Sequence, residues 1–196
     1  MRFHSILLIV VFTVLSACGD SAAKRAAEAA AEEAAKAKAQ AAAEDKRLKA
    51  LWSYHDAPSG NGRERSASIF STLSVETDGQ MPRPVRLVFR DRWSWPRSSY
   101  LVLEAGDFNC YNGCTVAVTV DEAAPVKLKG QRPATDEAIA MFINDWEALW
   151  RMIQGARHLS IEFPVKGRGT RTATFEVGGL NRSRMRGWDP PAERAP

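Results

Sequence analysis

Alternating apolar and polar residues predict most of the strands in the C-terminal two thirds of the chain. In these runs an apolar side chain recurs at every second position, which gives a strand one buried and one exposed face. Glycine, proline and asparagine separate the runs and predict turns between them. The predicted strands comprise residues 67–75, 85–90, 99–105, 115–121, 158–163 and 172–177.

A different spacing, with apolar residues three and four positions apart, predicts one helix in the same region. The apolar stripe runs from Ile139 to Ile153 and includes Phe142. Thr135 is the expected N-cap, and Gly155 is well placed to end the helix.

Short connections between successive strands favour antiparallel pairing, and a single helix can cover one face of the resulting sheet. We therefore expect an α+β domain at residues 51–181, built as an antiparallel sheet or a small β-sandwich with one packed helix. Residues 182–196 are rich in arginine and proline and are expected to form an irregular tail.

Residues 18–50 precede this domain and consist mainly of alanine and charged residues, which favour helix. No leucine, isoleucine or valine occurs after the predicted cleavage site until Leu48, so the helix has no apolar seam for a partner. We expect a long alanine-rich helical stalk that acts as a solvated spacer. A coiled coil that oligomerises the chain is the alternative.

The first seventeen residues have the layout of a cleavable signal peptide. Arg2 supplies a positive charge, and residues 6–15 form an apolar run. A helix of ten residues rises about 15 Å, half the thickness of a bilayer core. Residues 1–17 are therefore predicted to be a signal peptide, with a short N-terminal membrane anchor as the alternative.

Leu15, Ser16, Ala17 and Cys18 directly follow the apolar run. This tetrapeptide resembles the lipobox of bacterial lipoproteins. The resemblance implies cleavage before Cys18, a diacylglycerol thioether on its sulfur, and acylation of the new amino group with a fatty acid such as palmitate. Because the residue after Cys18 is Gly19 and not aspartate, Gram-negative sorting rules imply an outer-membrane lipoprotein, lipid-anchored and facing the periplasm.

An exported chain with a lipidated Cys18 leaves Cys110 and Cys114 to pair in an oxidising compartment. Closing this short ring removes about 2 kcal/mol of chain entropy from the unfolded state. A structural disulfide is expected. A redox centre is the alternative, although such pairs usually have two intervening residues where this one has three. A zinc site would need two further ligands.

Candidate catalytic residues are few. The sequence has no G-x-S-x-G motif, so His55 or His158 would have to serve as the base of any nucleophilic site. We expect no catalytic residue, no metal and no cofactor. A hydrolase that acts on an envelope substrate through one of these histidines is kept as the alternative.

The best candidate for recognition lies at a predicted hairpin tip. Trp93 and Trp95 stand beside Arg90, Arg92 and Arg97, and alternation would put both indoles on one side of the strand. Exposed aromatic side chains with arginines are typical of binding hot spots. The alternative is that both indoles pack on the core.

The charge of the chain is nearly balanced, with 27 basic and 23 acidic residues and a net charge of +4. Nucleic acid is therefore not an expected partner. Two arginine groups, one at residues 168 and 171 and one at residues 182, 184 and 186, could bind lipid phosphates or another anionic polymer. A solvated rim is the alternative interpretation.

A second set of motifs comprises residues 106–110, 156–162 and 175–180, with Cys114, Val116, Val118, Asp121, Asp136, Phe142 and Ile143 between them. These segments resemble small, mostly uncharacterised exported proteins of Gram-negative bacteria and, more remotely, the VasI family associated with type VI secretion. The resemblance covers about residues 52–181, and its motifs are structural. It implies a β-rich exported domain with a non-catalytic role, namely binding of an envelope protein partner or a scaffold function. A purely structural spacer or oligomer formed through the stalk is a further alternative.

Overall fold

The structure is a computed structural model that describes residues 17–133 and 139–189. The chain divides into two compact units, one up to Glu44 and one from Asp45 onward. The predicted signal peptide up to residue 16 and the predicted N-cap Thr135 lie outside the described residues. Within the described ranges, no helix combines the length and the apolar character that a bilayer crossing requires.

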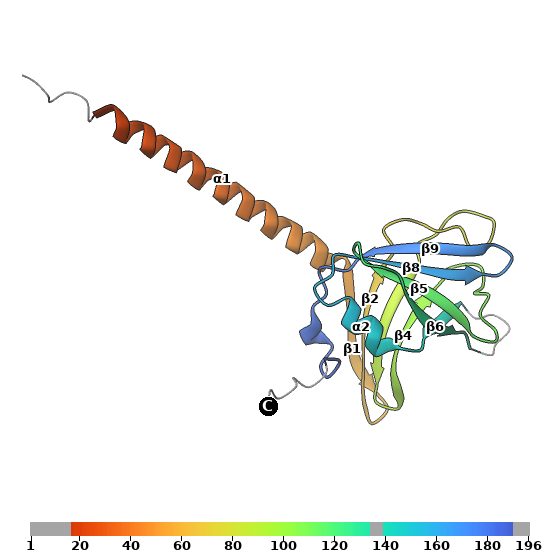
Figure 1. Cartoon of the computed structure of the whole chain (residues 1–196). Coiled ribbons are helices and arrows are strands. Elements are labelled where there is room, and N and C mark those ends of the chain that lie inside the picture. Colours follow the sequence, from red (N-terminus) through yellow and green to blue (C-terminus); the bar gives the residue numbers. More distant parts are fainter. Residues whose placement is uncertain (1–16, 134–138, 190–196) are drawn as a thin grey trace, which may run out of the picture. The chain divides into compact units, whose positions relative to one another are not determined.

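The alanine-rich segment is helical. Helix α1 spans Ala17–Ala50, and the side chains of residues 23–43 are all exposed (Figure 1). Glu32 and Lys36, one turn apart, form an ion pair with an O–N distance of 2.6 Å. Exposed pairs of this kind add only a few tenths of a kcal/mol, so the helix relies mainly on the intrinsic preference of alanine.

The second unit contains a nine-stranded antiparallel sheet with the strand order β1-β2-β3-β4-β7-β6-β5-β8-β9 (Figure 1). The α+β prediction is confirmed in its antiparallel-sheet form. The elements are β1 Trp52–Ser59, β2 Gly62–Phe70, β3 Arg86–Arg92, β4 Trp95–Val102, β5 Cys114–Val120, β6 Val126–Gln131, β7 Ala140–Ile143, α2 Trp146–Met152, β8 His158–Val165, β9 Gly169–Glu176 and the 3-10 helix η1 Arg182–Arg184.

Strand β7 joins two four-stranded halves into one sheet. It pairs with β4 from Val102 to Ser99 on one side, and with Gly130 and Gln131 of β6 on the other. The prediction of one long helix through this segment is therefore wrong. Met141 and Ile143 point into the core and the residue between them is half-buried, a period-two pattern that a short apolar run does not distinguish from a helix.

The helix that does form is short and begins after β7. Helix α2 is capped by Asp145, whose Oδ1 accepts the backbone N–H of Ala148 at 2.9 Å. Leu149 and Trp150 are the side chains that α2 buries. The helix ends at Met152 with Ile153 as its C-cap, and Gly155, which was expected to end the helix, lies two residues further on in the turn with φ +77°.

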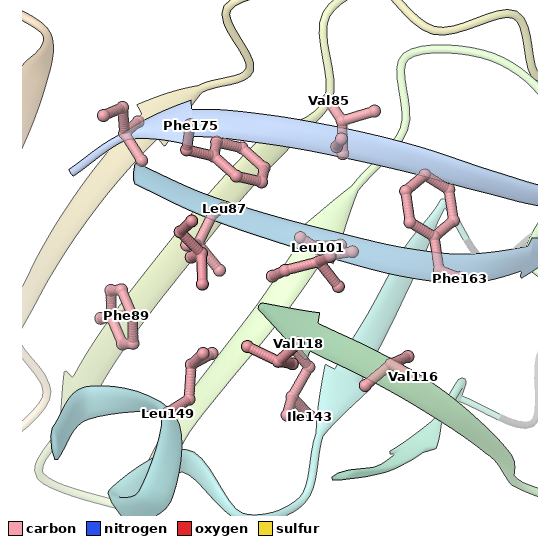
Figure 2. Packing of buried hydrophobic residues seen from close by; sticks show 14 of the residues in the cluster. Val85, Leu87, Phe89, Leu101, Val116, Val118, Ile143, Leu149, Phe163 and Phe175 are labelled. Atoms are coloured by element: carbon pink, nitrogen blue, oxygen red, sulfur yellow. The ribbon is translucent and has the colours of Figure 1, made fainter. Parts of the chain in front are cut away.

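Each of the nine strands contributes at least one buried side chain to one core. Leu87 of β3 and Phe175 of β9, which are both fully buried, come from opposite parts of the sheet and belong to the same hydrophobic cluster (Figure 2). The backbone N–H of Thr72, just after β2, donates to the Thr174 carbonyl of β9 at 2.7 Å. The sheet is therefore strongly coiled, and its two halves cover the same core from either side.

The packed core continues past residue 181, where we expected the domain to end. Met185 and Trp188 are 1% and 3% exposed, although they belong to the segment predicted to be an irregular tail. The ring of Trp188 lies 4.9 Å from that of Trp150 and 5.7 Å from that of Phe89. Two large apolar side chains in the last segment are the physical reason why it packs against the sheet.

Candidate functional site

Cys110 and Cys114 form the predicted disulfide, with an S–S distance of 2.04 Å. Gly113, inside the ring, adopts φ +84°, which is the conformation that favours glycine. Next to the ring, the Arg132 guanidinium lies 3.7 Å from the Tyr111 ring centre and 2.7 Å from a carboxylate oxygen of Asp107. The disulfide thus belongs to a fixed loop that leads into β5.

The two histidines of the hydrolase alternative lie in different surroundings. His158 Nδ1 is 3.7 Å from Asp121 Oδ1, but this oxygen already accepts the backbone N–H groups of Arg157 and His158 at 3.1 and 2.8 Å. The nearby Ser160 hydroxyl is hydrogen-bonded to Thr174 instead. Among the described residues, neither His158 nor His55 is hydrogen-bonded to a serine.

Trp93 and Trp95 both lie at the surface, with 54% and 57% of their area exposed, so they are not core residues. The register of β3 against β4 shifts between Arg90 and Arg92, and Trp95 then stands opposite Arg92. Trp93 instead covers the turn between β1 and β2, where a Cβ on Gly62 would lie 2.5 Å from the Trp93 Cβ. Simple alternation therefore does not describe the two indoles, because a bulge lies just before them.

The outer surface of β2, β3, β4 and β7 carries stacked arginine and aromatic side chains. The Arg90 guanidinium lies 5.9 Å from the Trp95 ring and 5.2 Å from the Tyr100 ring. Tyr100 is followed across the sheet by Phe142, with 5.3 Å between the ring centres. We call this surface the arginine–aromatic face, and it comprises Phe70, Arg86, Arg90, Arg92, Trp95, Tyr100 and Phe142.

The charge of the arginine–aromatic face comes from its arginines. Within the described ranges, Arg86 and Arg90 form no ion pair. Arg92 forms one, with its Nε 3.4 Å from a carboxylate oxygen of Glu64. Burial raises the pKa of the Tyr100 phenol, so this group stays neutral at physiological pH. The face is therefore a partly apolar surface with two positive groups that have no carboxylate counter-ion in this part of the chain.

Arg97 lies apart from the other predicted binding residues. It contacts the Asp91 carboxylate at 3.4 Å and lies 5.7 Å from the Trp146 ring. With Gly187 and Trp188 it lines a separate groove of about 260 Å³. The predicted group thus divides: Arg90, Arg92 and Trp95 share one face, Trp93 covers a turn, and Arg97 supports the helix α2 region.

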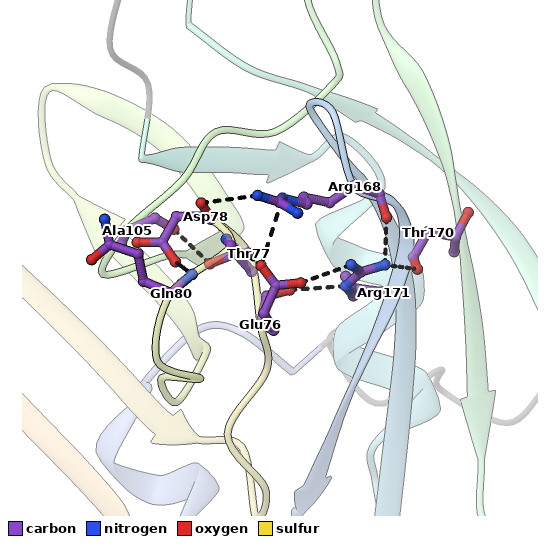
Figure 3. Close-up of polar contacts among 9 residues, drawn as sticks. Glu76, Thr77, Asp78, Gln80, Ala105, Arg168, Thr170 and Arg171 are labelled. Carbon is purple, nitrogen blue, oxygen red and sulfur yellow. Dashed lines mark hydrogen bonds and ion pairs between the residues drawn. The ribbon is translucent and has the colours of Figure 1, made fainter.

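Arg168 and Arg171, considered above as anion binders, hold a loop in place (Figure 3). Arg171 donates from Nη2 to a Glu76 carboxylate oxygen at 2.9 Å and from Nε to the Glu76 carbonyl at 2.8 Å. Arg168 donates to the Asp78 carbonyl at 3.3 Å. Hydrogen bonds from Arg171 and from the Gly79 N–H hold the pKa of the Glu76 carboxyl below its ordinary value. These arginines anchor residues 76–80 to the β8–β9 hairpin.

This geometry predicts a pH-dependent anchor. Because the folded pKa of Glu76 lies below its ordinary value of 4.5, the contribution of the charged group is present above that pH and is lost as pH falls through the folded value. The Gly79 amide resonance should therefore titrate with a midpoint below 4.5 in NMR spectra. Glu76→Gln should accelerate hydrogen exchange of this amide, whereas exposed Glu104→Gln should not. Unchanged exchange in Glu76→Gln would contradict the anchoring role.

Sequence reasoning missed four members of the arginine–aromatic face, namely Phe70, Arg86, Tyr100 and Phe142. Two of these positions could have been found from the sequence, because Arg86 and Tyr100 alternate with the buried apolar residues of two predicted strands. Their assembly depends on the pairing of β2 with β3, of β3 with β4 and of β4 with β7, which a single sequence does not reveal.

No family model, curated protein or solved structure matches this chain. The surfaces are therefore interpreted from their own geometry and charge.

Proposed function

We propose that this chain is a lipid-anchored envelope protein whose globular domain is a non-catalytic binding module for another envelope protein. The observation that carries this proposal is the stack of Arg90 with Trp95 and Tyr100 on the outer surface of the sheet. Arginine, tryptophan and tyrosine are the residues that most often dominate the energy of protein interfaces. Here they stand together on rigid strands.

The chemistry of the face defines the partner. Arg86 and Arg90 offer guanidinium groups beside exposed rings, so the complementary surface presents carboxylates flanked by apolar side chains. Stacking on a ring also restricts the guanidinium before binding, which lowers the entropy lost when a contact forms. The binding partner is accordingly an envelope protein with an acidic and partly apolar patch.

The N-terminal features support the anchored location in this proposal. The lipobox-like tetrapeptide ending at Cys18 would attach the chain to the membrane by lipid, with the outer membrane as the expected site. Helix α1 has 34 residues and would extend about 51 Å as a spacer. Its exposed, alanine-rich surface offers little area for association, which favours a spacer over a coiled coil. The remote resemblance to the VasI family stays a prediction.

Replacing the lipidation residue tests the anchor. Cys18→Ser should abolish labelling with a palmitate analogue and release the protein from the membrane fraction. The paired variant Cys110→Ser/Cys114→Ser should remain labelled and membrane-bound, because it removes thiols that the proposal assigns to a disulfide. Unchanged labelling and fractionation of Cys18→Ser would contradict lipid anchoring.

Substitution within the face tests the binding role. Arg90→Gln/Trp95→Ala should reduce the yield of a cross-linked partner complex in the envelope by about 10- to 100-fold, as expected for two hot-spot residues. Trp93→Ala/Arg151→Gln is the matched control, since it removes an indole of similar exposure and one arginine outside the face. Equal losses in both double variants, or no loss in the first, would contradict the proposal.

A further inference from the structure

A groove of about 510 Å³ lies where the β1–β2 hairpin meets the C-terminal segment. This volume is within the range of roughly 300–1,000 Å³ that is typical of small-ligand sites. We call it the arginine groove, and its lining residues are Tyr54, His55, Asp56, Arg63, Arg65, Ser183, Arg184 and Arg186. More than a hundred residues separate the two segments, so the fold alone assembles the site.

The arginine groove is strongly positive. Four arginines and one aspartate line it, which gives a formal charge of +3 from four positive and one negative side chains. The entire chain has a net charge of +4. Such a concentration of charge in a concave surface attracts anions and raises their local concentration.

The C-terminal wall of the groove is held in place by the core and by Tyr54. Met185, between the two groove arginines, is buried, so Arg184 and Arg186 are fixed at their backbone. The Tyr54 hydroxyl accepts the Asn181 N–H at 2.6 Å, and the Arg184 guanidinium lies 5.2 Å from the Tyr54 ring. Among the described residues, Arg186 has no ion pair or hydrogen bond of its side chain.

The strand wall is organised by Asp56. Its carboxylate oxygens lie 2.7 Å from Arg63 Nε and 3.5 Å from Arg65 Nε. The hydrogen bond from Arg63 is the largest of the effects that hold the pKa of Asp56 below its ordinary value, so this group remains charged at neutral pH. The Asp56 carboxylate thus contacts both arginines through Nε, and Arg63 Nη2 also donates to the Asp56 carbonyl at 3.4 Å.

We propose that the arginine groove binds a phosphate group. Guanidinium donors reach the groove from strand β2, through Arg63 and Arg65, and from the C-terminal segment. A phosphate is tetrahedral, carries a charge near −2 as a monoester, and accepts from several directions at once. A planar carboxylate can be satisfied by the fork of a single arginine, whereas four arginines surround this groove. A phospholipid headgroup and a soluble phosphorylated compound share the required chemistry.

This site is independent of the proposed protein-binding function. Tyr54 and Asp56 pair with Ala67 and Arg65, whereas the arginine–aromatic face uses the alternate residues of β2 and β3. Apart from His55 of the edge strand, the strand residues of the groove therefore lie on the opposite side of the sheet from the arginine–aromatic face, and substitutions in one surface leave the residues of the other unchanged.

Titration of the purified full chain with pyrophosphate, followed by calorimetry, tests the proposal. Arg184→Gln/Arg186→Gln should weaken pyrophosphate binding about tenfold or more, because two charge-assisted contacts are lost. Lys127→Gln/Lys129→Gln, which removes two exposed charges outside the groove, should bind as the wild type does. In parallel, co-sedimentation with phosphatidylcholine vesicles, with and without phosphatidic acid, measures recognition of a lipid phosphate.

Loss of binding in the groove variant alone supports the proposal, in either the soluble or the vesicle experiment. Binding of pyrophosphate without a response to phosphatidic acid assigns a soluble ligand, and the reverse assigns a lipid headgroup. Equal weakening in the lysine variant would show attraction to general charge and would overturn the site. Equal affinity for citrate, or no saturable binding to either probe, would overturn it as well.

Discussion

A chain shortened to end at Asn181 is expected to lose its cooperative unfolding transition. The change removes Met185 and Trp188, both of which are buried in the domain core. The Trp188 ring contacts those of Trp146 and Trp150 at 4.8 and 4.9 Å. Loss of a buried tryptophan and a buried methionine costs roughly 5 kcal/mol or more. This is comparable with the 5–15 kcal/mol that holds a typical domain folded.

Urea unfolding followed by tryptophan fluorescence and near-ultraviolet circular dichroism measures this effect. A chain that ends at Asp189 is the reference, because it retains the buried Met185 and Trp188 and the hydrogen bond between Trp150 and Asp189. Trp188→Ala in the full chain separates the contribution of the ring from that of the segment and should lower the free energy of unfolding by about 3–5 kcal/mol. An unfolding midpoint equal to that of the reference would show that the last segment is a dispensable tail.

The second large effect is expected for Trp150→Ala, which should lower the free energy of unfolding by about 3–5 kcal/mol. Trp150 is 1% exposed and its ring meets Phe89 edge-on, with 5.1 Å between the centres. Its indole N–H donates to Asp189 at 3.0 Å. The substitution therefore leaves a cavity and also removes a hydrogen bond that joins α2 to the C-terminal segment.

Two further variants make this prediction specific. Trp93→Ala removes an indole that is 54% exposed, and its effect on the free energy of unfolding should stay within about 1 kcal/mol. Trp150→Phe keeps most of the packing and deletes the hydrogen bond, so its cost should lie between those of the two alanine variants. Similar costs for Trp150→Ala and Trp93→Ala in urea unfolding would contradict the core position of Trp150.

The pKa of Asp189 reports the same contact. Burial is the largest effect and raises it, but hydrogen bonds from Trp150 and Arg182 together hold it below the ordinary value. Removal of the indole N–H in Trp150→Phe should therefore raise the pKa of Asp189. The charged carboxylate of Asp189 stabilises the folded state at pH values above its ordinary pKa of 3.8. This stabilisation is lost as the pH falls through the lower pKa that Asp189 has in the folded protein.

Strands with clear alternation were predictable from the sequence. The apolar phase of β5 and β8 marks the core side without ambiguity, since Val116, Val118, Leu159 and Ile161 are all fully buried. The strand expected at residues 67–75 is shifted, because β2 begins at Gly62 and ends at Phe70. Residues 71–74 form no regular strand. The serine and threonine in this segment occur in strands as well as in bends, so they did not predict that the strand ends at Phe70.

The missed strands have physical explanations. Strand β1 is an edge strand with mainly polar residues and Pro58, which an edge tolerates because one side of it has no partner strand. Strand β6 alternates two exposed lysines with buried Leu128 and Gly130. Because glycine has no apolar side chain, the sequence does not show this alternation. Strand β7 has four residues, and only its position between β4 and β6 makes it a strand.

The surfaces were less predictable than the fold. Trp95 and Arg90 were recognisable as a candidate pair, but Tyr100 and Phe142 reach them only through sheet pairing. The arginine groove unites residues near position 60 with residues near position 185, and no local pattern encodes that contact. Burial of Met185 could not be anticipated either, because its neighbours are arginines and glycine.

Site-specific photo-crosslinking in living cells tests the central claim most directly. A photoreactive phenylalanine analogue at position 95 should form one dominant protein adduct in the envelope, and Arg90→Gln in the same chain should remove it. The same analogue at position 127, which lies outside the arginine–aromatic face, should not form that adduct. An absent adduct at position 95, or the same adduct from position 127, would contradict a binding role for this face.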